Sequence, residues 1–107
     1  MNTTITELND RFRQGDMKLG QYMMSVGVQA LARSKQVELI RLVQGFDSFT
    51  PDNDPYKEHD FGRVSMDGRD YFWKIDYYDP TKRQHSDDPA SPNATRRVLL
   101  LMLSSEY

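Results

Sequence analysis

Cysteine is absent from the 107 residues, which excludes disulfides, thiol nucleophiles and cysteine zinc sites. A chain without cysteine suits a reducing compartment, so we expect a cytoplasmic protein. Long apolar runs are also missing, because the longest, VLLLML at 98–103, is far shorter than the ~18 residues of a membrane helix. The start at Met1 lacks the basic and apolar segments of a signal peptide. We therefore expect no contact with a membrane.

An excess of positive charge is missing as well. The formal net charge is −2, and residues 47–95 carry eleven Asp or Glu against six Lys or Arg. A nucleic-acid-binding protein needs a basic stripe to neutralise phosphates, so direct binding to nucleic acid is not expected. An acidic central segment is compatible with docking on a basic partner protein, and solvated loops are the other interpretation.

The motifs of the common catalytic and cofactor sites are absent. The chain has no P-loop, no G-x-G-x-x-G, no G-x-S-x-G and no H-E-x-x-H. The loop that begins at Asp52 is not an EF-hand, because it lacks the glycine at the sixth position and the glutamate at the twelfth. No cofactor is predicted, and no enzyme class is indicated.

The clearest local signal is a β-hairpin. Two β-rich runs flank Asp67-Gly68, a dipeptide typical of type I′ turns. A two-residue turn pairs Met66 with Arg69 and, counting outward, His59 with Asp76. Along the second run, alternation predicts a core face made of four apolar or aromatic side chains: Tyr71, Trp73, Ile75 and Tyr77.

The other segments complete an α+β pattern within one domain, 1–107. Residues 5–12 predict a first helix, 22–28 a strand broken at Gly27, and 28–46 a helix that has a potential break at Ser34. Residues 95–107 form a strand or a buried helix, and a strand buried on both faces is favoured. We expect a small antiparallel sheet of three or four strands with a central hairpin, packed against one or two helices.

Several long motifs carry a resemblance to a known family. They are DNDPYKEHDFG at 52–62, FWKIDYYD at 72–79, and RVLLLML at 97–103 followed by a terminal EY, with N-D-x-F-R at 9–13. The chain resembles the bacterial and mobile-element family called domain of unknown function 3768, which has no assigned activity. The resemblance implies an accessory protein of plasmids, phages or integrative elements. By that association we expect an inhibitor of host defence, of the anti-CRISPR or anti-restriction type, that docks on a host protein handling nucleic acid.

A non-enzymatic binding protein is the first functional hypothesis. The acidic loops and nearby exposed aromatic side chains would contact the partner, as acidic rims around aromatic anchors do in protein interfaces. The predicted partner-binding residues are Asp52, Asp54, Tyr56, Glu58, Asp60, Tyr78, Asp87 and Asp88.

An enzyme or a nucleotide-binding sponge is the alternative hypothesis. Its site would form around the predicted His59–Asp76 pair, with Lys74 and Glu58 nearby, since a carboxylate can orient an imidazole for general-base work. A structural cross-strand ion pair is the other interpretation. Metal binding is not predicted, although Asp52, Asp54, Glu58, His59 and Asp60 are suitable ligand types. In a strand, Glu58 and Asp60 would point to one face and His59 to the other.

Overall fold

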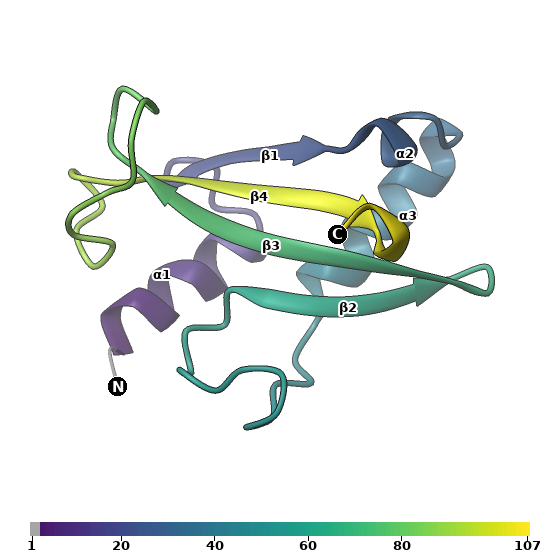
Figure 1. The fold of residues 1–107 in the computed structure, drawn as a ribbon, viewed down its shortest axis with the longest axis horizontal. Helices are drawn as coiled ribbons and strands as arrows, with labels where there is room; N and C mark the ends of the chain where they lie inside the picture. The colour runs from purple at the N-terminus through teal and green to yellow at the C-terminus, as the bar shows by residue number, and fades with distance from the viewer. Residues whose placement is uncertain (1–2) are drawn as a thin grey trace.

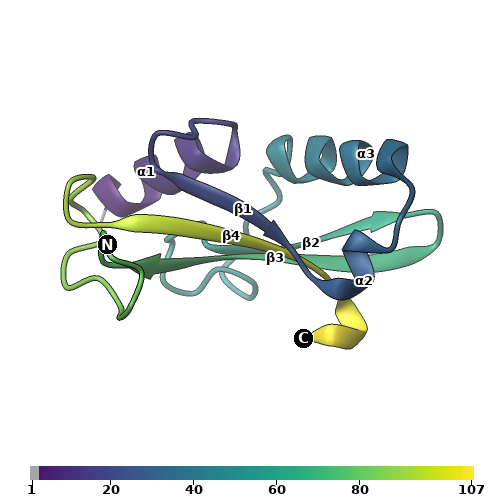
Figure 2. The ribbon, with the colours of Figure 1, turned by 90° about the horizontal axis from the view of Figure 1, so that it is seen from above.

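The computed structural model describes residues 3–107 and shows a four-stranded sheet with its two longer helices on one face (Figure 1, Figure 2). The elements run in the order α1 (Thr3–Arg13), β1 (Gly20–Met24), α2 (Val26–Gln29), α3 (Arg33–Gln44), β2 (Phe61–Met66), β3 (Arg69–Tyr78), β4 (Arg96–Leu103) and the 3₁₀ turn η1 (Ser104–Glu106). The predicted α+β class is confirmed. Among the helices of this described part, none is long and apolar enough to cross a bilayer.

The sheet is mixed, which corrects the prediction of an antiparallel sheet. The strand order is β1-β4-β3-β2, and β1 lies parallel to β4 while the other neighbours are antiparallel. Parallel neighbours need a long crossover connection, and here the connection includes α2, α3 and the hairpin. Local sequence patterns carry no information on this pairing, because the two strands are separated by most of the chain.

The hairpin prediction is confirmed. Asp67 and Gly68 have φ values of 52° and 77°, the left-handed values that a type I′ turn requires. The register runs from Met66↔Arg69 to Phe61↔Lys74, as the two-residue turn predicts. The strand prediction for the C-terminal apolar run is confirmed by β4, which pairs with β3 on one side and β1 on the other.

The expected helix over 28–46 is divided earlier than Ser34. Ser25 begins α2, because its Oγ accepts a hydrogen bond from the Val28 N–H, and this cap also ends the strand at Met24 rather than at 28. Gln36 then donates its side-chain amide to the carbonyls of Val28, Gln29 and Leu31 at 3.1–3.2 Å. These bonds satisfy the end of α2 and allow α3 to start at Arg33.

The core lies between the sheet and the helices α1 and α3, which lie on the same face of the sheet (Figure 2). The predicted core residues Tyr71, Trp73 and Ile75 are buried, and Tyr77 is half-buried. Gly62 lies opposite Trp73, and a Cβ on this glycine would approach the indole Nε1 to 2.5 Å. Only glycine therefore allows the Trp73 ring to lie against the backbone of β2.

Candidate functional site

The polar face of α1 holds the chain segment that leads into β2. Thr6, Asn9, Asp10 and Arg13 occupy positions i, i+3, i+4 and i+7, so they project from one side of the helix. The Thr6 hydroxyl donates to the carbonyl of Lys57, and Asn9 Nδ2 donates to the carbonyl of Glu58 at 2.9 Å. Residues 57–58 are thereby fixed to the helix through their backbone.

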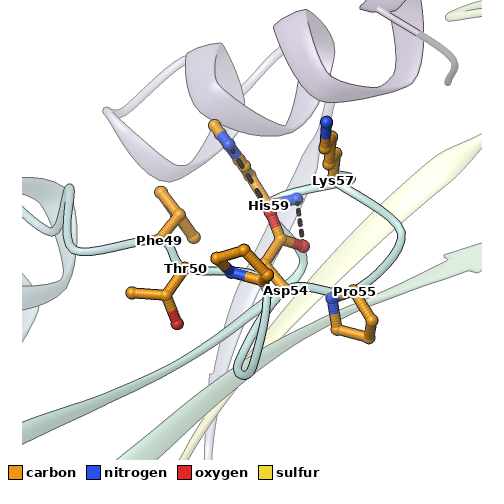
Figure 3. A pocket seen from close by; sticks show the side chains of 7 residues that line it. Phe49, Thr50, Asp54, Pro55, Lys57 and His59 are labelled. Carbon is orange, nitrogen blue, oxygen red and sulfur yellow. Dashed lines mark hydrogen bonds and ion pairs between the residues drawn. The ribbon is translucent and has the colours of Figure 1, made fainter.

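His59 lies between two carboxylates. Its Nδ1 is 2.8 Å from Asp10 Oδ1, and its Nε2 is 3.5 Å from Asp54 Oδ2. Arg13 Nη1 lies 2.9 Å from the same Asp10 oxygen, and the imidazole stacks on Phe49 with 3.8 Å between ring centroids. Figure 3 shows the His59 ring and backbone directed toward Asp54. Both ring nitrogens therefore face protein carboxylates.

The backbone around this histidine takes an uncommon conformation. Lys57 and His59 have φ values of 58° and 57°, in a region that costs a non-glycine residue about 1–2 kcal/mol. The ladder between β2 and β3 continues only to the bond from Ile75 N–H to the Asp60 carbonyl, 2.8 Å. The turn at His59 takes the chain away from β3, so the predicted His59–Asp76 pair is wrong.

A cavity of about 240 Å³ opens beside His59 (Figure 3). It is lined by Phe49, Thr50, Pro51, Asp54, Pro55, Lys57 and His59. An imidazole held by carboxylates is well oriented for proton transfer, but here both ring nitrogens face carboxylates of the protein itself. The arrangement therefore resembles a structural ion pair more than a general base.

Glu58 belongs to a buried polar network. The fully buried Arg97 donates from Nε to Asn9 Oδ1 at 2.7 Å, and Asn9 Nδ2 donates to the Tyr77 hydroxyl at 2.7 Å. That hydroxyl donates to Glu58 Oε1 at 2.8 Å. Burial raises the pKa of Tyr77, so the phenol keeps its proton at neutral pH and acts as a donor. Burial lowers the pKa of Arg97, because the charged guanidinium is removed from water. The network links α1, the segment before β2, β3 and β4.

The four residues of the alternative catalytic site are not brought together. The Glu58 carbonyl and the His59 ring contact side chains of α1, on the helical side of the sheet. Lys74 alternates with the core residues of β3 and pairs with Asp76 at 3.2 Å on the opposite face. The sheet separates the two pairs.

The predicted partner-binding residues divide by exposure. Asp52, Tyr56, Asp87 and Asp88 are exposed, whereas Glu58, Asp60 and Tyr78 are half-buried. Asp54 is only 5% exposed and accepts a hydrogen bond from the His59 N–H at 3.2 Å, so it is not available to a partner, which corrects the prediction for this residue. Burial raises the pKa of Asp60, with the nearby Glu58 carboxylate as the next cause.

The carboxylates and histidines do not converge on a metal site in the described part of the chain. Across residues 3–107, no group of three or more His, Asp or Glu side chains is placed to hold a metal ion.

The anchoring role of α1 was missed from the sequence. A signal for it existed, because Thr6, Asn9, Asp10 and Arg13 form a polar stripe at helical spacing on a helix whose other side is apolar.

The fold and the site together define a small α+β protein in which His59 is held by contacts with α1 and with Phe49. The chain belongs to the family described as protein of unknown function (DUF3768), whose model matches residues 24–106. The anchoring helix α1 lies before the matched segment, and so does the N-D-x-F-R motif. No curated protein and no solved structure matches the chain.

Proposed function

We propose that this protein is a non-enzymatic binding protein that docks through its acidic loops on a basic surface of a partner protein. The observation that carries the proposal is a set of four exposed aspartates without an ion-pair partner among residues 3–107. They are Asp47, Asp52, Asp87 and Asp88.

Other aspartates of the chain are neutralised within the fold. Asp16 pairs with Arg11, Asp67 with Lys35 and Asp76 with Lys74. Unpaired carboxylates on loops keep their full field, which steers association with a basic surface and selects against acidic partners. The 79–95 loop also carries Lys82 and Arg83, so the 47–60 loop supplies most of the unbalanced negative charge.

Tyr56 supplies the apolar part of the proposed interface. Its side chain is 78% exposed near the tip of the 47–60 loop, four residues after Asp52. Tyrosine is enriched among the residues that dominate binding energy, especially when surrounded by polar side chains. Truncation of Tyr56 to alanine is expected to weaken binding by about tenfold.

We propose further that the partner is a host protein that handles nucleic acid, such as a CRISPR or restriction component. Such proteins carry basic surfaces that neutralise phosphates, and exposed aspartates compete for the same surfaces. The mobile-element setting that the family resemblance implies supports this choice. An anti-defence inhibitor of this type would need no cofactor.

The test is affinity capture from a nuclease-treated bacterial lysate, followed by measurement of the salt dependence of binding. The Asp52→Lys/Asp88→Lys double variant is expected to lose capture of the protein that the wild type retains. The control is Glu7→Lys/Glu38→Lys, which makes the same charge change at two exposed positions on α1 and α3. Equal capture by wild type and the loop variant, or binding indifferent to salt, would contradict the proposal.

The cavity beside His59 supports a second candidate, a small-molecule or nucleotide site. Lys57 and His59 line it together with the aromatic ring of Phe49. Titration of labelled protein with AMP tests this candidate through the resonances of these residues. Shifts that saturate in the wild type and are lost in Lys57→Ala would support it, and unchanged resonances would remove it.

A further inference from the structure

The strand β2 forms one edge of the sheet, and its outer side carries free backbone groups. In a two-residue hairpin the residues flanking the turn, Met66 and Arg69, form a hydrogen-bonded pair. Alternation then gives Gly62 and Val64 bonds toward β3, in agreement with the bond from Ile75 N–H to the Asp60 carbonyl. The N–H and C=O groups of Phe61, Arg63 and Ser65 therefore point away from the sheet.

A groove runs along this edge. A cavity of about 340 Å³ lies between the start of β2 and the segment 46–53. Its lining combines three aromatic rings with polar loop residues: Phe46, Ser48, Asn53, Phe61, Gly62, Arg63 and Phe72. Gly62 has no side chain to obstruct a chain that approaches the edge.

The groove has an apolar part and a cationic part on the same face of β2. Phe61 and Phe72 lie 5.2 Å apart between ring centroids, and the exposed ring of Tyr107 packs against both at 5.4 and 5.2 Å. These three rings form the apolar part. Arg63 follows Phe61 by two residues, so its side chain points to the same face. The Arg63 side chain is 66% exposed, and its pair with Asp70 is loose, at 4.0 Å.

We infer that this groove takes an extended peptide segment of a partner protein, which adds to β2 as a fifth strand. Strand addition uses backbone hydrogen bonds for affinity and alternate side chains for specificity. An apolar side chain would lie against Phe61 and Phe72, and an acidic side chain two residues away would pair with Arg63. Asp47 and Asp52 belong to the segment 46–53, which forms one side of the groove. Because their negative charges disfavour a run of acidic residues, the partner peptide carries a single acidic residue.

A second copy of the chain is a poor occupant of the same edge. Antiparallel pairing of β2 with itself, centred on its outward-facing residues, places Arg63 opposite Arg63 of the other copy. Like charges directly opposite in a sheet are destabilising. The inference concerns Arg63 on the β2 edge and a peptide with one acidic residue, so it is independent of the acidic loops proposed above.

The test uses blocked nonapeptides and ¹⁵N-labelled protein. The probe is TTTFTETTT, and its matched control is TTTFTKTTT. Binding of the probe is expected to slow hydrogen exchange at the backbone amides of Phe61, Arg63 and Ser65. Arg63→Glu is expected to weaken the probe by about fivefold and to strengthen the lysine peptide. Arg41→Glu, an exposed charge reversal on α3, is expected to change neither.

A backbone variant makes the test independent of charge. Ser65→Pro removes an outward N–H without breaking the ladder to β3, so the fold is kept and peptide binding is expected to fall at least about tenfold. Ser65→Ala is the matched control and is expected to bind as the wild type does.

Three results would overturn the inference. They are the absence of any protection by the probe, protection located at other amides, and an equal loss of binding in Arg41→Glu. Protection of the same amides without peptide, rising with protein concentration, would show that the edge pairs with a second copy instead.

Discussion

The acidic stretch 52–60 before β2 has an outer half, whose side chains are exposed, and an inner half, whose side chains are tied to the fold. Residues of the two halves alternate along the chain. In one half, Asp52 and Tyr56 are exposed and make no ion pair within the part of the chain that is described. In the other half, Asp54, Glu58 and His59 are tied to the fold and to α1. Composition alone makes the stretch look like one site. The difference shows that long-range anchoring decides which charges remain available for a partner.

The largest expected effect on this comparison comes from the helix that anchors the inner half. Asn9→Ala removes the acceptor of the buried Arg97 Nε and the donor to Tyr77, and leaves the Pro89 carbonyl as the remaining acceptor of the guanidinium. We expect a loss of about 2–4 kcal/mol in the free energy of unfolding. Urea denaturation measures it. A loss below that of Thr4→Ala, at an exposed position of the same helix, would contradict the anchoring role.

The two histidines provide the next test. His59→Ala removes the hydrogen bond with Asp10 and the stack on Phe49, and places alanine at a positive φ. We expect a loss of about 1–3 kcal/mol from these terms together. His85→Ala, at the exposed histidine, is expected to change stability by less than about 0.5 kcal/mol. Thermal denaturation of both variants would show equal stabilities if His59 were free for catalysis.

Asp60 tests the comparison through the pH dependence of stability. Burial raises its folded-state pKa above the unfolded value, so the native carboxyl binds its proton more tightly than the unfolded chain does. Its contribution to stability is therefore present at low pH and lost as pH rises through the folded-state pKa. We expect Asp60→Asn to melt at a higher temperature than the wild type at pH 7. The difference should vanish near pH 3, and a lower melting temperature at pH 7 would contradict this.

The pKa of Glu106 is shifted in the opposite direction from that of Asp60. Hydrogen bonds from Ser25 Oγ and from the backbone of Leu103 and Gly27 hold its pKa below the usual range. Its contribution is present above the unfolded-state pKa and lost as pH falls through the folded-state pKa. We expect Glu106→Gln to flatten the acid side of the stability profile. An unchanged profile between pH 5 and pH 2, followed by thermal melting, would show that this cap is unimportant.

The smallest stability effects are expected in the outer half of the stretch. Asp52→Lys removes no ion pair of the described chain, so its free energy of unfolding should equal that of the wild type within about 0.5 kcal/mol. Thermal denaturation measures the difference. Binding of the captured partner should nevertheless fall. A variant that unfolds instead would place Asp52 with the inner half.

Local patterns predicted the parts of the fold that depend on neighbouring residues. The Asp67-Gly68 turn determines the β2–β3 register, and alternation along β3 gives the core face that contains Trp73. The parallel pairing of β1 with β4 depends on contacts distant in sequence, and no periodicity contains it. The position of His59 was mispredicted because its positive φ ends the ladder, and contacts with α1 maintain that conformation.

We propose that the unpaired aspartates, rather than His59, carry the function. The most direct measurement is the amount of partner captured from nuclease-treated lysate by Asp52→Lys/Asp88→Lys and by Glu7→Lys/Glu38→Lys, at equal protein concentration and low salt. The prediction is loss of capture for the loop variant and wild-type capture for the control. Full capture by the loop variant, or equal loss in both, would contradict it.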